Sequence, residues 1–120
     1  MVSDDLQEEA GIFTWPLAGN MIYGDTAVAY LFGLDPTRTV KGLTARHYLK
    51  GVYTNDRDVV ARLWFLAIRS RNSFHVEFRV KDAQGVYRRV ASSGRCFGDA
   101  IDHQAHFVGI VYPISMLSLV

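Results

Sequence analysis

The chain has 120 residues, of which 49% are hydrophobic, and its formal net charge is +1 at pH 7. This length fits one domain that buries about two thirds of its unfolded surface, and the weak net charge argues against direct contact with nucleic acid. Cys96 is the sole cysteine, which excludes an internal disulfide, and the acidic start MVSDDLQEEA lacks the pattern of a signal peptide. We therefore predict a cytoplasmic domain.

The first half of the chain predicts a hairpin followed by short helices. Asp25 or Thr26 is suited to cap a helix that Gly33 ends, and Asp35-Pro36-Thr37 forbids a simple continuation of that helix. The elements expected in chain order are a polar lead-in or cap (residues 1–10), a strand (11–17), a tight turn (18–20), an antiparallel return (21–23), a helix (27–32) and a second short helix (44–49).

The second half predicts one long helix and three strands. After Tyr53-Thr54-Asn55-Asp56, apolar residues recur at helical spacing and indicate a buried face: Val59, Val60, Leu63, Leu66 and Ala67. Apolar and charged side chains then alternate over residues 74–81, which is typical of a half-buried strand. A turn at residues 82–85 leads into a second strand from Val86, and a last strand covers residues 106–114.

The C-terminal run FVGIVYPISMLSLV is the most hydrophobic part of the chain. It is shorter than the roughly 20 residues of a membrane-spanning helix, and Pro113 interrupts it, so we expect a strand and no membrane segment.

Several short motifs follow one another along residues 11–115. They are Gly11-Ile12-Phe13-Thr14-Trp15, Leu31-Phe32-Gly33-Leu34-Asp35-Pro36, Asn55-Asp56-Arg57, Phe74-x-x-Glu77-Phe78-Arg79-Val80, Gly85 with Arg88, Ser92-x-Gly94-Arg95, and Phe107-Val108-Gly109-Ile110-Val111 with Ile114-Ser115. In this order and spacing they resemble a PAS domain of the subtype common in bacterial sensory proteins. Residues 116–120 are then the start of a C-terminal linker.

The resemblance implies an α+β fold: a five-stranded antiparallel sheet with short helices and one longer helix packed on one face. Two positions depart from the family pattern. Tyr53-Thr54-Asn55-Asp56 replaces the usual His-Pro-Asp-Asp, and Pro113-Ile114-Ser115 replaces the usual Asp-Ile-Thr. Because proline has neither a carboxylate nor an N–H, the chain must leave the sheet differently, either by a plain extended or turned segment or with a functional difference.

The resemblance also implies a cavity between the concave sheet face and the helices. Val90, Ser92, Gly94 and Cys96 share one strand face, where their small volumes leave room beside larger side chains. Alternatively, the small residues only allow close packing. The candidates for the cavity are Tyr30, Tyr48, Trp64, Phe78, Val90, Ser92, Gly94, Cys96 and Val111. If the cavity is open, we expect it to admit a small organic ligand, polar or carboxylate-bearing. Ser92 could then donate to a ligand oxygen, and Tyr48 or Tyr30 could present a hydroxyl at the mouth; alternatively, each is an ordinary half-buried side chain with a solvated polar tip.

The usual cofactors of this family are not predicted. Residues 56–72 contain no histidine for haem, and Cys96 lies on a late strand, whereas flavin photosensors need a cysteine on the helix before the long one. A metal site is not expected either. Asp99, Asp102, His103 and His106 offer ligand types, but they fall where a hairpin loop would be polar in any case.

Val108, Ile110 and Tyr112 lie on the other face of the last strand and need cover, which favours a homodimer. Two hypotheses of function stay open. The chain is a sensory input module without catalysis, which binds a small ligand and regulates an effector in the same polypeptide, such as a histidine kinase, a diguanylate cyclase or a DNA-binding regulator. Alternatively, it is a ligand-free module for dimerisation and protein interaction. A third class, a cone-shaped isomerase, would need an acidic residue in the cavity, and none is in register.

Overall fold

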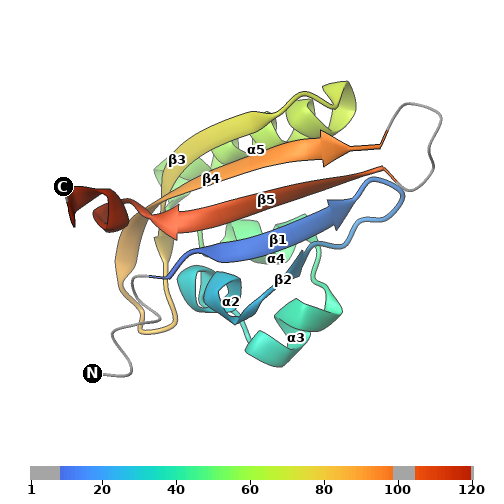
Figure 1. The fold of residues 1–120 in the computed structure, drawn as a ribbon. Coiled ribbons are helices and arrows are strands. Elements are labelled where there is room, and N and C mark those ends of the chain that lie inside the picture. The colour runs from blue at the N-terminus through green and yellow to red at the C-terminus, as the bar shows by residue number, and fades with distance from the viewer. Residues whose placement is uncertain (1–8, 99–104, 120) are drawn as a thin grey trace.

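The computed structural model describes residues 9–98 and 105–119 (Figure 1). Its elements are β1 (Gly11–Pro16), β2 (Tyr23–Gly24), α2 (Thr26–Phe32), α3 (Pro36–Lys41), α4 (Ala45–Lys50), α5 (Thr54–Ser70), β3 (Phe74–Lys81), β4 (Tyr87–Phe97), β5 (His106–Pro113) and the 3-10 helix η1 (Ile114–Leu119). Among the described residues, no helix is both long enough and apolar enough to cross a lipid bilayer.

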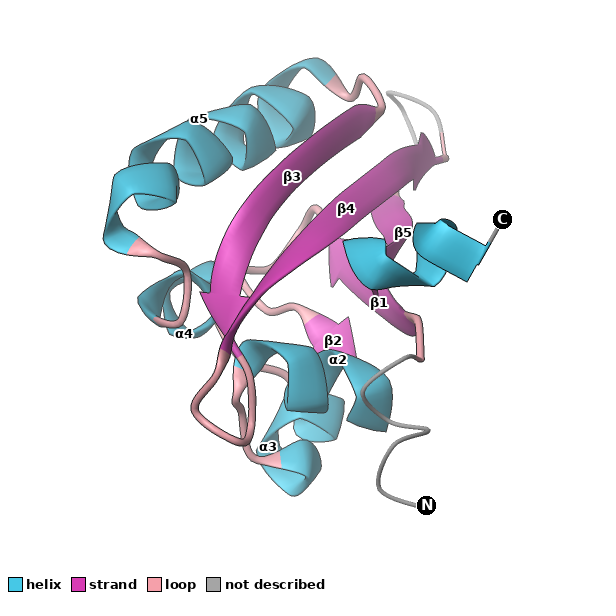
Figure 2. Cartoon of the chain, turned by 90° about the vertical axis from the view of Figure 1, so that its left-hand side faces the viewer, coloured by secondary structure: helices cyan, strands magenta, loops and turns pink. Residues whose placement is uncertain are grey.

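The strands form one five-stranded sheet in the order β2-β1-β5-β4-β3, and all neighbours are antiparallel. The helices α2 to α5 lie on one side of this sheet, and η1 lies on the other side (Figure 2). The predicted α+β class, with short helices and one longer helix on one face, is therefore confirmed. We call the face toward α2 to α5 the inner face and the opposite one the outer face.

Alternation along the strands separates the two faces. On the inner face, β3 buries Val76, Phe78 and Val80, while its charged residues stay exposed, as the sequence pattern predicted. The hairpin register pairs Phe78 with Val90 and Val76 with Ser92, so β4 turns these residues toward the same core.

Asp25 ties β1 to α2. Its Oδ1 accepts a hydrogen bond from Val28 N at 3.0 Å, which caps the helix, and its Oδ2 accepts one from Ile12 N at 3.1 Å. One carboxylate thus satisfies backbone donors in a strand and in a helix. The cap expected at Asp25 or Thr26 is Asp25, and Gly33 ends the helix with a φ of 65°.

The sequence reading missed α3. Helix α2 does not continue through Asp35-Pro36-Thr37, but Pro36 begins a new helix, because the first helical position needs no N–H. Asp35 caps this helix by accepting a hydrogen bond from Arg38 N at 2.9 Å.

The predicted buried face of α5 was wrong at two positions. Val59 and Leu66 are 53% and 50% exposed, whereas Val60, Trp64 and Ala67 are buried. The buried stripe therefore follows the spacing i, i+4, i+7 from Val60, and the other two side chains lie beside it.

Candidate functional site

A small cavity of about 20 Å³ lies between the inner face of the sheet and the helices. Such a volume is enough for about one water molecule. Residues far apart in the sequence line it: Phe13, Trp15, Ile22, Val28, Phe32, Tyr48, Trp64, Phe74 and Ser92. Strands β1, β3 and β4 and helices α2, α4 and α5 each contribute at least one of these side chains.

Aromatic rings make most of the wall and contact one another in pairs. Trp15 and Trp64 meet edge to face with ring centroids 6.0 Å apart, and Phe32 meets Tyr48 in the same way at 5.2 Å. Phe13 and Phe74 stack at 6.4 Å. Edge-to-face and offset arrangements are the favourable ones for such rings, so the wall is well packed around the space it leaves.

Three polar groups belong to this apolar lining. The Tyr48 hydroxyl donates a hydrogen bond to Ile22 O at 3.1 Å, and burial raises the pKa of Tyr48. The Trp64 Nε1 atom is buried and has no acceptor within the part of the chain that the structure describes. Ser92 is almost fully buried and is the one serine among the lining residues. Buried donors normally have partners, so the Trp64 N–H is unusual among the groups around this cavity.

The structure brings three of the predicted cavity residues together, namely Tyr48, Trp64 and Ser92. Tyr48 does not lie at a mouth, because its ring is buried and its hydroxyl is bonded inside. Tyr30 is half-buried and does not line the cavity.

The other candidates belong to the inner face but not to the cavity wall. Phe78, Val90 and Val111 are buried core residues, and Cys96 is half-buried near the end of β4. Gly94 faces the Phe74 ring so closely that an added Cβ would lie 2.6 Å from Phe74 Cε2. At this position, therefore, the small residue allows close packing and leaves no free space.

Sequence reasoning missed two residues of β1 that line the cavity, Phe13 and Trp15. Both are on the buried positions of an alternating strand, and that pattern was available as a signal. Ile22, Val28 and Phe32 were also missed. They reach the cavity because β2 and α2 fold back over β1, which no local pattern indicates.

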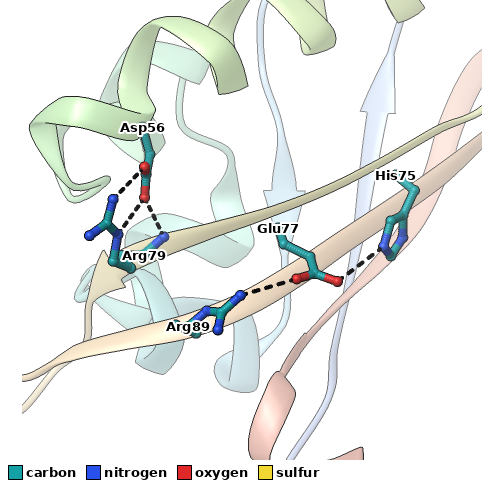
Figure 3. A network of polar contacts seen from close by, with 5 residues as sticks. All are labelled: Asp56, His75, Glu77, Arg79 and Arg89. Atoms are coloured by element: carbon teal, nitrogen blue, oxygen red, sulfur yellow. Dashed lines mark hydrogen bonds and ion pairs between the residues drawn. The ribbon is translucent and has the colours of Figure 1, made fainter.

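A polar cluster at the edge strand positions α5, which carries Trp64 (Figure 3). Asp56 Oδ2 accepts hydrogen bonds from Arg79 N and Nε, both at 2.9 Å, and its Oδ1 accepts one from the guanidinium at 2.8 Å. Hydrogen bonds from the Arg79 side chain hold the pKa of Asp56 below its usual range. The Arg79 guanidinium also lies over the Tyr53 ring, 4.2 Å from its centroid.

Further along the same face, Glu77 is within 3.4 Å of the Arg89 guanidinium and 3.9 Å of His75 Nε2. These side chains are about half or more exposed, so each pair contributes little to stability. We therefore assign the cluster a structural role, with the Asp56 and Arg79 pair as its main contact.

The outer face carries the predicted interface residues. Ile110 is 42% exposed, and Val108 and Tyr112 are half-buried on the same side of β5. Ile12, which pairs with Ile110 across the sheet, is 56% exposed. Of the polar motif near the β4–β5 connection, Asp99, Asp102 and His103 lie outside the described residues, so the expectation of no metal there stays a prediction.

The residues present do not fit a haem or a flavin. A haem or flavin ring system is much larger than a cavity of about 20 Å³, and Cys96 is not among the lining residues. The helix α5 has no histidine. The absence of haem and flavin remains a prediction.

No protein family model matches the chain, and no curated protein matches it. Solved structures do resemble it. The N-terminal domain of a diguanylate cyclase with PAS/PAC sensor from Marinobacter aquaeolei is 12% identical, with a TM-score of 0.77 over 92% of this chain and 99% of that chain.

Two further structures agree with this likeness. A sensory box histidine kinase/response regulator from Burkholderia thailandensis is 19% identical, with a TM-score of 0.68 over 98% of this chain and 83% of that one. A PAS domain from Colwellia psychrerythraea is 13% identical, with a TM-score of 0.64 over 94% and 93%. At such identities the likeness establishes the fold. The chain has the PAS fold, as the sequence motifs predicted.

Proposed function

We propose that this domain is the sensory input module of a larger signalling protein, in which a small molecule held in the cavity changes the activity of an attached effector. The observation that carries the proposal is the enclosed aromatic cavity with a buried donor, Trp64 Nε1, that lacks an acceptor among the described residues. The similar solved structures come from a diguanylate cyclase and a histidine kinase, which supports effectors of these kinds.

The sheet offers a short route from the cavity to the C-terminal end of the domain. Ser92, in the cavity wall, pairs with Val111 on β5, and Val111 lies two residues before Pro113, where β5 ends. Directly after it comes η1, which contacts β4 on the outer face. A guest that pushes on Ser92 therefore acts on the strand that leads out of the domain.

The lining also defines the class of guest. It contains aromatic and aliphatic side chains, one serine and no charged residue. A carboxylate would lose its hydration without gaining a cation, so the expectation of a carboxylate-bearing ligand does not suit this cavity. We propose a neutral molecule, small enough to be admitted by modest movement of the rings, with at least one hydrogen-bond acceptor.

Replacing Ser92 with Leu tests this site. A panel of small neutral molecules would be screened by thermal denaturation of the wild-type domain, since a ligand that binds only the folded state raises the melting temperature. The variant Ser92→Leu fills the cavity and should abolish the shift. Ser93→Leu makes the same change on the opposite face of β4 and should keep it. An equal shift in wild type and Ser92→Leu would exclude the cavity as the binding site.

A second candidate function is dimerisation through the outer face. Ile12, Ile110 and Phe97 are 56%, 42% and 48% exposed there, and Val108 lies among them in one shallow apolar surface. Apolar side chains that cluster on an uncovered sheet face favour a protein partner, and a second copy is the simplest one because one patch can serve both partners. The two functions are compatible, since they use opposite faces of the sheet.

A further inference from the structure

Helix α5 exposes three large apolar side chains to solvent, although its other side covers the inner face of the sheet. Val59, Phe65 and Leu66 are 53%, 59% and 50% exposed. Figure 2 shows α5 on the outside of the molecule and on the side of the sheet away from η1. Single exposed apolar side chains need no explanation, but three within two turns of one helix form a patch.

Two arginines lie among these side chains. Arg62 and Arg69 are exposed, and side chains three or four positions apart are neighbours on a helix surface. Arg62 is therefore a neighbour of all three apolar residues, and Arg69 is a neighbour of Phe65 and Leu66. The Arg69 guanidinium lies 5.9 Å from the centroid of the Phe65 ring. We call Val59, Arg62, Phe65, Leu66 and Arg69 together the α5 ridge.

The charge around the α5 ridge is mainly positive. The exposed charged side chains of α4 and α5 are four basic ones and one acidic one, namely Arg46, Lys50, Arg62 and Arg69, with Asp58. The formal net charge of the whole chain is only +1, so its basic residues are unevenly placed. A surface of this kind repels a second copy of itself and attracts an anionic partner.

An anionic lipid surface suits both kinds of side chain on the α5 ridge. Guanidinium groups bind lipid phosphates, while aromatic and aliphatic side chains enter the boundary between headgroups and acyl chains. A nucleic acid would bind the arginines but leave Val59 and Leu66 in water. A partner helix would need one continuous apolar stripe, which Arg62 and Arg69 interrupt. A bilayer surface has no such requirement, because long basic side chains reach the headgroups beside inserted apolar ones.

We propose that α5 binds peripherally to a membrane surface that contains anionic phospholipids, with Phe65 and Leu66 at the acyl boundary and Arg62 and Arg69 at the phosphates. The helix has 17 residues and carries charged ones along its length, so it would lie on the bilayer and not cross it. The inference goes beyond the proposed function, because it uses neither the cavity nor the outer face of the sheet.

The variant Phe65→Trp places a fluorescent reporter on the α5 ridge. The two native tryptophans, Trp15 and Trp64, are 9% and 6% exposed, so their emission should change little when a surface binds. We expect vesicles of phosphatidylcholine and phosphatidylglycerol in equal amounts to move the emission of Phe65→Trp to shorter wavelength, because the new ring leaves water. Vesicles of phosphatidylcholine alone should bind at least about tenfold more weakly, since each arginine near an anionic surface adds about fivefold.

Phe97→Trp is the matched control. Phe97 is 48% exposed on the outer face of the sheet, and the Arg95 guanidinium lies 5.6 Å from its ring centroid. This position therefore repeats the pairing of an exposed ring with an arginine, on the side of the sheet opposite to α5. The emission of Phe97→Trp should not change when the mixed vesicles are added.

Cosedimentation with the same mixed vesicles separates the two contributions. Phe65→Ser removes an apolar contact and Arg62→Gln removes a charge, and each should lower vesicle binding by about fivefold or more. Arg95→Gln, on the outer face, should bind like the wild type. Phe65, Arg62 and Arg95 are all exposed, so the melting temperatures of these variants should stay close to that of the wild type.

A shift to shorter wavelength in Phe65→Trp, with none in Phe97→Trp, supports the α5 ridge whatever Ser92→Leu shows, so this inference and the proposed function fail separately. A shift in Phe97→Trp alone would mean that the outer face binds the membrane, which overturns the proposal. Equal binding to both kinds of vesicle overturns it, as does no binding to either. Weaker binding in Arg62→Gln but not in Phe65→Ser would mean that the surface recognises charge alone, as for an acidic protein or a nucleic acid, and overturns the lipid partner.

Discussion

Asp56 joins the start of α5 to the edge strand β3 by three hydrogen bonds to a single residue, Arg79. One of them satisfies a backbone N–H at the sheet edge, and the other two engage the guanidinium in a bidentate pair. Tyr53 N completes the contact by donating to Arg79 O at 2.8 Å. Backbone groups at a helix end and at a sheet edge lack partners within their own element, and this contact supplies partners for both.

Replacing Asp56 with Asn should lower the melting temperature by a few degrees at neutral pH, because the bidentate, charge-assisted pair with Arg79 is lost. The folded state holds the Asp56 proton less readily than the unfolded chain does, since its pKa is lowered. Its stabilisation is therefore complete above the unfolded pKa of about 3.9 and is lost as the pH falls through the folded pKa.

Thermal melts from neutral to acid pH check the direction of this pH dependence. The difference between wild type and Asp56→Asn should be constant from pH 6 to 8 and should shrink below about pH 4. Asp58→Asn removes the same charge from an exposed position two residues later and should have a smaller effect. A difference that grows toward acid pH would contradict the assignment.

Individual residues of the site could be predicted from the sequence only where the alternation along one strand determines to which face of the sheet the side chain points. Ser92 was found because β4 alternates, and its neighbours on the same face followed. Tyr30 and Tyr48 could not be ranked from the sequence, since both are tyrosines in short helices. The hydroxyl of Tyr48 is buried against Ile22 O, a residue 26 positions away, and this contact depends on the whole fold.

At the scale of elements, the strands and α5 were predictable because their patterns are long. The helix α3 was missed because it has six residues and one buried position, Thr39, so no periodicity develops. Its start depends on Asp35 and Pro36, which are also residues typical of a turn. The exposure of Leu66 on α5 could not be predicted either, because α5 has more apolar residues than the sheet can cover.

Replacing Asp25 tests how the elements β1 and α2 are joined. Asp25→Ala removes the acceptor of Val28 N and of Ile12 N, so α2 loses its cap and β1 loses its link to the helix. We expect a loss of about 1–2 kcal/mol in the free energy of unfolding, measured by urea denaturation with an unchanged m-value.

Thr26→Ala is the control for this cap, because Thr26 is exposed at the first position of the helix. It should change the unfolding free energy by much less. Hydrogen exchange adds a local readout: the amides of Ile12 and Val28 should lose protection in Asp25→Ala more than amides of β3 do. Equal losses in both variants would show that Asp25 is not the anchor.

At the scale of the whole molecule, the two faces of the sheet have different surroundings. Its inner face meets α2 to α5 and encloses the cavity, while its outer face is covered only in part by η1 (Figure 2). The sequence could predict this division, because β5 is apolar on both faces. It could not predict the α5 ridge, which depends on which side of α5 packs against the sheet.

Ile110 stands at the centre of the proposed dimer contact and is paired with Ile12 on the neighbouring strand, so the two side chains form one exposed apolar ridge. A stable interface needs more than about 1,000 Å² of buried surface, which requires this ridge to be covered. We therefore expect the wild-type domain to sediment as a dimer at micromolar concentrations and Ile110→Glu to sediment as a monomer, since the charge would be buried without a partner. Val59→Glu places the same charge on an exposed apolar position of α5, on the other side of the sheet, and should remain dimeric. A wild-type monomer throughout this range, or a dimer that survives Ile110→Glu, would rule out the outer face as the interface.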